Sequence, residues 1–146
     1  MKKCIINLII PLLVGGIVSL IMMPFMDYNE LTLPFLAPPA ILFPIAWTIL
    51  YILMGISAYI VCLNNNDKVP LIYYVQLGVN ALWSIIFFVF KLRFLAFIWI
   101  ILLIILVIKM IKEFKDINKI AAYLQILYLL WIIFAAYLNL EIYILN

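Results

Sequence analysis

The 146-residue chain contains no histidine and only two cysteines, and charged residues make up 10% of it. The absence of histidine excludes histidine-based catalytic triads, histidine-containing zinc sites and histidine-ligated haem. The two cysteines, Cys4 and Cys62, provide no disulfide framework and lack the spacing of a metal-binding motif. The small net charge of +3 comes from loop lysines and does not indicate binding to nucleic acid.

Hydrophobic residues, in contrast, make up 71% of the chain. No soluble domain of this size has a core large enough to bury so much apolar surface. A helix that spans a membrane needs about 20 apolar residues, so the chain has room for about five spans with short loops. We therefore predict an all-α integral membrane protein, a bundle of five transmembrane helices that forms one domain over residues 1–146. The expected spans are about 5–26, 39–63, 70–90, 94–110 and 119–141.

The chain is organised around the stretch PPAILFPIAWTILYILMG, residues 38–55. Its prolines predict a stiff loop that enters a long apolar helix, because proline fixes φ and removes a backbone donor. Trp47, Tyr51, Met54 and Ala58 follow at steps of four, three and four, so they share one helix face. This aromatic face suggests a site for a flat aromatic ligand. The alternative is a membrane helix with interfacial aromatic anchors.

The third expected span carries a polar stripe formed by Gln76, Asn80 and Ser84, with Trp83 and Phe87 beside it. A carboxamide facing lipid would leave its donors and acceptors unpaired, at a cost of roughly several kcal/mol. We therefore expect this stripe to face the interior of the bundle. There it either holds helices together or lines a cavity and binds a ligand through hydrogen bonds.

Three further features concern packing and access. Gly15 and Ser19 in the first span allow close helix approach. We predict that they serve internal packing, and the alternative is a homodimer contact. Residues 27–37 form the longest predicted loop, and such loops often serve as lids. In the last span one helix face carries an aromatic group at one end and small residues further along. The members of that face are Tyr128, Trp131, Ala135 and Asn139.

Three stretches of the chain match patterns of one membrane protein family. PPxxxFPxAWTxLYxxMG, QLxxNxxWSxxFF and LWxxFAxxLN occur in this order in the second, third and fifth expected spans. Together they resemble the TspO/MBR family, the tryptophan-rich sensory proteins and translocator proteins. The resemblance implies a five-helix bundle with a central pocket under the first loop, and a ligand of the tetrapyrrole class. Ligand-binding positions carried over from it, with Trp83 added from the polar stripe, are Tyr28, Pro39, Trp47, Tyr51, Asn80, Trp83, Trp131 and Ala135.

The first loop departs from the family pattern. Asp27 and Leu33 stand where a tryptophan and a basic residue are usual, and Leu36 and Ile41 replace two more tryptophans. The lid is therefore expected to hold ligands differently.

The resemblance leaves three kinds of function open. The first is a receptor or sensor that binds porphyrins or similar flat hydrophobic molecules in the lipid bilayer, with no cofactor and no metal site. The second is an enzyme that degrades porphyrin in light, with Trp47 and Trp131 as the implicated tryptophans. The third is a transporter. The spans lack the deep ionisable groups and internal repeats that ion-coupled transporters usually carry, so this transporter would be passive.

Basic residues are distributed unequally between the two expected sides of the membrane. One side carries Lys2, Lys3, Lys68, Lys109, Lys112, Lys115 and Lys119, and the other carries Lys91 and Arg93. Positive charge favours the cytoplasmic side. We therefore predict that the N-terminus is cytoplasmic and that the C-terminus and residues 27–37 lie outside.

Overall fold

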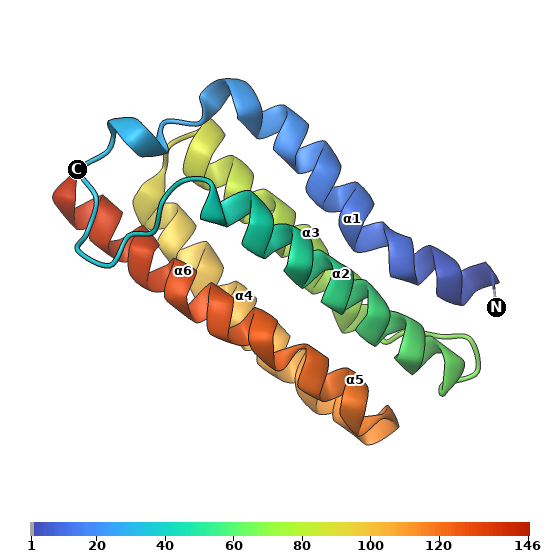
Figure 1. Ribbon diagram of the computed structural model, residues 1–146. Coiled ribbons are helices and arrows are strands. Elements are labelled where there is room, and N and C mark those ends of the chain that lie inside the picture. Colours follow the sequence, from blue (N-terminus) through green and yellow to red (C-terminus); the bar gives the residue numbers. More distant parts are fainter. Residues whose placement is uncertain (1) are drawn as a thin grey trace.

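The computed structural model describes residues 2–146, and within that range it contains helices and no strand (Figure 1). Five helical segments are long and apolar enough to cross a membrane. The prediction of an all-α, five-helix integral membrane protein is therefore confirmed. The elements are α1 (Lys2–Met22), η1 (Met23–Phe25), η2 (Tyr28–Glu30), α2 (Leu42–Leu63), α3 (Leu71–Ser84), η3 (Ile85–Val89), α4 (Arg93–Ile117), α5 (Lys119–Leu124) and α6 (Ile126–Leu145).

Several helix ends differ from the expected spans: the first helix begins at Lys2 and the last ends at Leu145, and two further differences have a clear cause. The second helix begins at Leu42 and not at residue 39, because the backbone before it turns: Pro39 accepts a hydrogen bond from the Leu42 amide. The fourth continues beyond residue 110 to Ile117, because Met110 and Phe114 remain fully buried along the same face. The fifth span consists of α5 and α6, which meet at Gln125, and the third ends in the π-helix η3.

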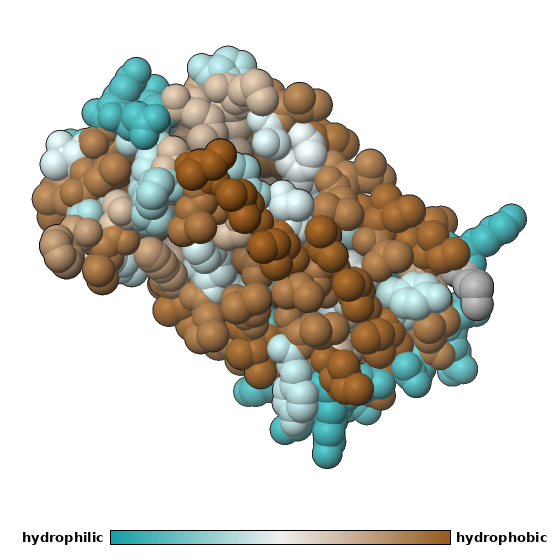
Figure 2. Space-filling view, viewed as in Figure 1, coloured by the Kyte–Doolittle hydropathy of each residue, from teal (hydrophilic) through white to brown (hydrophobic). Residues whose placement is uncertain are grey.

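Each span runs antiparallel to the one before it in the chain. Because the number of spans is odd, the N-terminal and C-terminal helices end at opposite ends of the bundle (Figure 1). Helix α1 lies at the edge of the bundle, and its span is the least buried of the five. Figure 2 shows hydrophobic side chains over the middle of the molecule and hydrophilic ones gathered toward the two ends. This distribution is the one expected of a protein surrounded by hydrocarbon at its centre and by water at its ends.

Glycines allow α1 to approach α2 closely. A Cβ atom added at Gly55 would overlap the backbone carbonyl of Leu8, and one at Gly15 would overlap the Tyr51 ring. Gly15 therefore serves internal packing, as the sequence predicted for this part of the first span. The antiparallel pairing also brings the beginning of α1 beside the end of α2.

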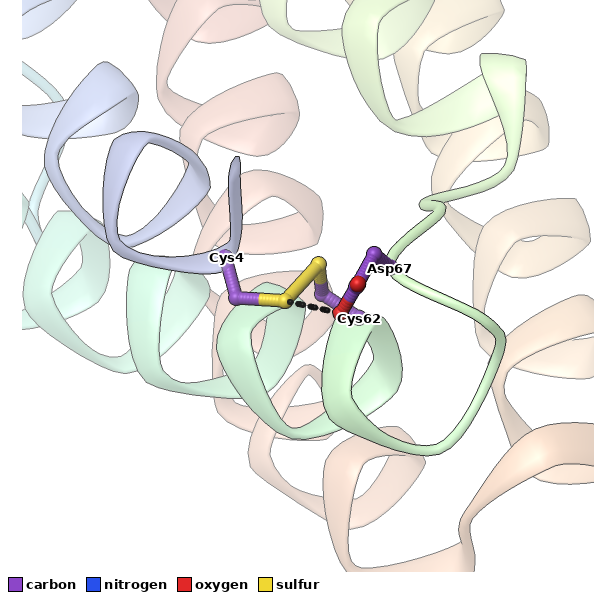
Figure 3. A group of neighbouring side chains, drawn as sticks. All are labelled: Cys4, Cys62 and Asp67. Atoms are coloured by element: carbon purple, nitrogen blue, oxygen red, sulfur yellow. Dashed lines mark hydrogen bonds between the residues drawn. A yellow bond between two sulfur atoms is a disulfide. The ribbon is translucent and has the colours of Figure 1, made fainter. Parts of the chain in front are cut away.

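That pairing corrects one expectation. The interpretation that Cys4 and Cys62 provide no disulfide framework is wrong, since the two residues form a disulfide bond (Figure 3). They are 58 positions apart in sequence, but their Cα atoms are 5.4 Å apart because α1 and α2 run in opposite directions. This separation lies within the usual range for disulfides. A count of cysteines could not reveal it, because it depends on how the two helices dock.

Candidate ligand-binding site

A cavity of about 380 Å³ lies between α1, α2, the α3–η3 segment and α6, at the end of the bundle that carries the first loop. Its size is within the range of small-molecule sites, roughly 300–1,000 Å³. The lining is mainly hydrophobic and aromatic. It consists of Gly15, Val18, Ser19, Met22, Met23, Met26, Tyr28, Ala40, Phe43, Pro44, Trp47, Tyr51, Trp83, Ser84, Phe87, Phe88, Ala135, Leu138, Asn139 and Ile142.

Trp47 lies at the centre of an aromatic cluster on one wall of this cavity. Its ring stacks on Tyr51, with centroids 5.5 Å apart and an interplanar angle of 28°. Trp83, Tyr128 and Trp131 surround it, with centroid distances of 6.5, 6.3 and 6.3 Å. The i, i+4 spacing of Trp47 and Tyr51 in α2 explains the stacked pair, because such residues lie one above the other.

A buried network of hydrogen bonds lies beneath the aromatic cluster. The Asn80 carboxamide accepts from the Tyr51 hydroxyl at 3.0 Å and donates to the Tyr128 hydroxyl at 2.7 Å. The Tyr128 hydroxyl in turn donates to Gln76 Oε1 at 2.8 Å. The polar stripe of α3 therefore faces the bundle interior, as expected, and it connects α3 to α2 and α6.

A second network reaches from the cavity to Arg93, at the beginning of α4. The Trp83 indole donates to Asn139 Oδ1 at 3.0 Å, and Asn139 Nδ2 donates to the Arg93 backbone carbonyl at 2.8 Å. The Arg93 guanidinium lies 5.0 Å from the ring centroid of Phe87, in a cation–π contact. Cavity-lining side chains thus touch the residue that holds the first loop.

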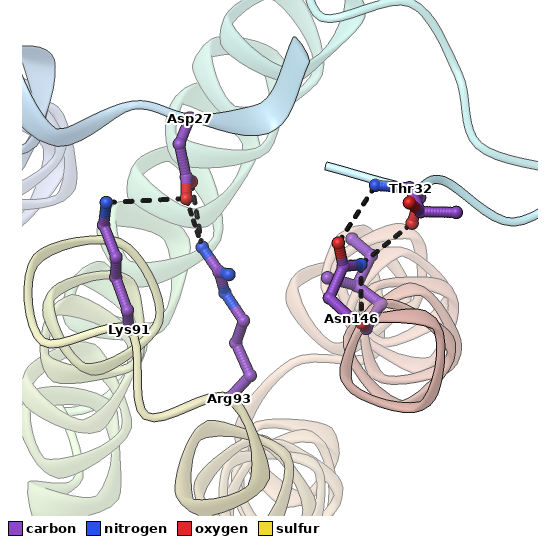
Figure 4. Close-up of polar contacts among 6 residues, drawn as sticks. Asp27, Thr32, Lys91, Arg93 and Asn146 are labelled. Atoms are coloured by element: carbon purple, nitrogen blue, oxygen red, sulfur yellow. Dashed lines mark hydrogen bonds and ion pairs between the residues drawn. The ribbon is translucent and has the colours of Figure 1, made fainter. Parts of the chain in front are cut away.

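The first loop is fastened by an ion pair (Figure 4). Arg93 donates twice to the Asp27 carboxylate, at 2.7 and 2.9 Å, and both side chains are only 12% exposed. Lys91 lies farther from Asp27, at 3.6 Å, and is 50% exposed. A charged pair therefore anchors the start of the first loop.

Two further contacts close the loop over the bundle. The Tyr28 hydroxyl donates to the Pro38 carbonyl at 2.6 Å, and burial raises the pKa of Tyr28 above its ordinary value. Asn146 pairs with the backbone of Thr32: its side chain accepts from the Thr32 amide and donates to the Thr32 carbonyl, both at 3.0 Å (Figure 4). We call residues 27–37, held by these contacts, the lid.

The candidate residues predicted from the sequence divide into two groups. Five line the cavity: Tyr28, Trp47, Tyr51, Trp83 and Ala135. Three do not: Pro39 lies in the connection before α2, Asn80 lies in the network below the aromatic cluster, and Trp131 packs edge-on against Trp47. The Trp131 indole nitrogen is buried, with no hydrogen-bond partner among residues 2–146. Contact of any of the eight with a ligand stays a prediction.

The sequence did not indicate the contribution of the first span to the cavity wall. Met22, Met23 and Met26 form part of the lining, as do Phe43 and Phe88. Methionine is flexible and polarizable and adapts to irregular surfaces. The concentration of three methionines within five positions before the lid is the signal that could have drawn attention to this wall.

The chain is similar to three curated proteins. It is 47% identical over 64 residues to the tryptophan-rich protein TspO of Archaeoglobus fulgidus. The aligned stretch is 42% of this chain and 42% of that protein. It is 40% identical over 65 residues to the tryptophan-rich sensory protein of Cereibacter sphaeroides, which is 44% of this chain and 41% of that protein. It is 40% identical over 79 residues to protein CrtK of Rhodobacter capsulatus, which is 51% of this chain and 49% of that protein.

These alignments span less than half the length of the relatives they match. The model of the TspO/MBR family, by comparison, matches residues 7–145, from the first turns of α1 to the end of α6. With the five-helix fold and the tryptophan-bearing motifs in place along nearly the whole chain, this protein belongs to the TspO/MBR family.

Proposed function

We propose that this chain is a membrane receptor that binds tetrapyrroles such as porphyrins, or similarly flat hydrophobic molecules, in a sensory or regulatory role. The observation that carries the proposal is the stacked pair Trp47–Tyr51 on the wall of an apolar cavity. Aromatic faces stack favourably on a flat ring system. The sensory role agrees with one similar protein, which is named a tryptophan-rich sensory protein.

The lid supports the same proposal. It covers the cavity end of the bundle and is fastened by the ion pair of Asp27 with Arg93. Arg93 also contacts Phe87, which lines the cavity. A ligand that filled the cavity would press on side chains that hold the lid. Binding and lid position would then be coupled, which is a property that a sensor requires.

The test is a titration of the purified protein with protoporphyrin, followed by the quenching of tryptophan emission. Trp47→Phe should weaken binding by about 1 kcal/mol, or roughly fivefold, the scale of an aromatic pair. Trp131→Phe should also weaken it, but less, because Trp131 lies behind Trp47. The two losses should not add, since both variants disturb one cluster.

Trp99→Phe is the matched control. Its indole donates to the Val79 carbonyl at 2.9 Å and does not line the cavity, so porphyrin affinity should be unchanged. If the variant lacking both Trp47 and Trp131 binds protoporphyrin as tightly as the native protein does, the proposed site is wrong.

A second candidate function is the light-dependent breakdown of a bound porphyrin. The observation in its favour is the contact between Trp47 and Trp131, because indoles can be oxidised and these rings lie 6.3 Å apart. Illumination of the porphyrin complex, with the products identified by mass spectrometry, separates this function from binding alone. An enzyme would yield a new product that disappears in both Phe variants at saturating porphyrin, whereas a receptor would return intact porphyrin.

A further inference from the structure

The bond between Cys4 and Cys62 lies at the end of the bundle opposite the lid and takes no part in the cavity. Both cysteines are fully buried, and Asp67 lies beside them, with its Oδ1 atom 3.5 Å from Cys4 Sγ (Figure 3). These three side chains form one compact group. Because the two sulfurs are bonded to each other, they are not available as thiolate ligands for a metal ion in this state.

The charge of this end of the molecule conflicts with a permanent disulfide. The end carries Lys2, Lys3 and Lys68. The last turns of α4 add Lys109, Lys112 and Lys115, and α5 begins with Lys119. Positive charge of this kind favours the cytoplasmic side of a membrane, where thiols are normally kept reduced. We propose that Cys4 and Cys62 form a reversible thiol–disulfide site that fastens α1 to α2 when oxidised and releases it when reduced. This proposal does not depend on the ligand of the cavity.

The position of Asp67 suits the reduced state. Sulfur in a disulfide has no hydrogen to donate, so the carboxylate gains no hydrogen bond from Cys4 in the bonded form. On reduction the Cys4 thiol becomes a donor with a charged acceptor already within reach. The chain holds Asp67 there in a left-handed conformation, with φ of 59°, and its amide donates to the Cys62 carbonyl. A non-glycine residue adopts this conformation at a cost, which the turn at the end of α2 sustains.

The exchange needs only a thiol compound such as glutathione and its disulfide. A thiolate attacks one sulfur, the Cys4–Cys62 bond breaks, and a mixed disulfide forms. A second thiol then displaces the protein sulfur, so that two protein thiols and one small-molecule disulfide result. Oxidation is the same sequence in reverse. Because both sulfurs are buried, exchange requires opening of the turn at residues 64–68, and we expect it to be slow.

The mechanical consequence falls on α1. This helix packs at the bundle edge, and its far half supplies Gly15, Val18 and Met22 to the cavity wall. The disulfide fixes its beginning, while Gly15 and Gly55 fix its middle by close contact with α2. Reduction removes the first of these fastenings and should increase the mobility of the residues near Cys4.

The experiment uses the full-length protein in lipid nanodiscs, equilibrated for hours in mixtures of glutathione and glutathione disulfide. After acid quenching and denaturation, an alkylating reagent labels free thiols, and mass spectrometry counts the labels. The chain has two cysteines, so every label reports this pair. We expect a transition from two labels to none across the mixtures. No label under the most reducing mixture, or two labels under the most oxidising one, would overturn the proposal.

Matched variants test Asp67 and the fastening of α1. Asparagine at position 67 tolerates the same backbone conformation but offers a neutral acceptor, so Asp67→Asn should stabilise the reduced thiol less. The disulfide should then persist to a ratio of glutathione to its disulfide that is roughly fivefold more reducing. Asp116→Asn removes the same charge at the same end and should leave the midpoint unchanged. Equal shifts in both would refute the role of Asp67.

Hydrogen exchange near Cys4 should be roughly fivefold faster in the reduced protein and in a variant with serine at both cysteines. Identical exchange in the oxidised and reduced proteins would refute the fastening.

Discussion

Asn80 connects three helices through one carboxamide. It lies in α3, accepts from Tyr51 of α2 and donates to Tyr128 of α6. Its neighbours in the network are buried, so the loss of this side chain leaves polar groups that water cannot easily reach. At this scale the protein uses a single amide where hydrophobic packing alone would not fix the rotation of the helices.

Asn80→Ala should therefore destabilise the protein by about 1–2 kcal/mol, the cost of leaving one buried hydroxyl without its acceptor. Tyr128 would keep its bond to Gln76, whereas Tyr51 would lose its acceptor. Denaturation in detergent, monitored by circular dichroism, measures the change. Leu82→Ala on the exposed face of the same helix is the control and should cost less. Equal destabilisation in both variants would contradict the role assigned to the network.

Ala135 contributes to the cavity through its small size. Ala135→Leu should weaken protoporphyrin binding, because the added atoms would enter the cavity, and should leave the unfolding temperature nearly unchanged. Ala136 is the matched neighbour: it is buried to a similar degree but does not line the cavity. Ala136→Leu should instead destabilise the fold by about 1–3 kcal/mol through overpacking. An Ala135→Leu protein with native affinity would show that the ligand lies elsewhere.

At the scale of elements, a partly buried ion pair joins the lid to helix α4: Asp27 of the lid pairs with Arg93 at the beginning of α4. The Asp27 and Arg93 side chains are both largely buried, and the Arg93 guanidinium also lies over the Phe87 ring. Removal of one partner leaves the other charge without compensation in a poorly solvated site. Lys91 is half exposed and farther from Asp27, so it contributes little.

Asp27→Asn should loosen the lid, and Lys91→Gln should not. The measurement is hydrogen exchange of residues 27–37, for which we expect protection to fall by at least roughly tenfold in the first variant. Protoporphyrin should also dissociate faster from Asp27→Asn than from the native protein. If both substitutions affect exchange equally, the pair with Arg93 does not hold the lid.

The contact of α1 with α2 offers another pair of matched substitutions. Gly55→Ala should be destabilising, because its Cβ would overlap the backbone carbonyl of Leu8, which cannot move without shifting α1. Gly78 in α3 faces open space, so Gly78→Ala should be neutral or stabilising by up to about 1 kcal/mol. The unfolding temperature should therefore fall in Gly55→Ala and stay unchanged or rise in Gly78→Ala. A stabilised Gly55→Ala protein would show that α1 does not lie on α2 as described.

For the whole molecule, the distribution of basic residues predicts orientation. Seven lysines at the N-terminal end, against Lys91 and Arg93 at the lid end, favour a cytoplasmic N-terminus and an outer lid. An enzyme reporter fused after Asn146, of a kind active only outside the cytoplasm, should therefore be active. A reporter active only inside would reverse the orientation, and with it the side assigned to the disulfide.

The parts of this architecture that the sequence predicts are those that depend on helical periodicity. Tyr51, Met54 and Ala58 share a face and are buried, and so are Gln76 and Asn80, because spacing alone determines which side chains point the same way. Contacts between distant segments do not follow from spacing. The pair of Asp27 with Arg93 spans 66 positions, and the disulfide depends on the docking of two antiparallel helices. The position of Trp131 behind Trp47 likewise depends on rotamers and on the approach of α6 to α2.

The disulfide also changes the covalent topology of the chain. In the oxidised protein, residues 4–62 form a closed ring, and the lid lies within that ring. A protease that cut the lid once, beside the fully exposed Phe35, would open the ring without dividing the molecule. The nicked protein would run as one band without reductant and as two bands with it. Both lid ends also stay joined through α1 and α2, so even a severed lid would keep its two halves near the cavity.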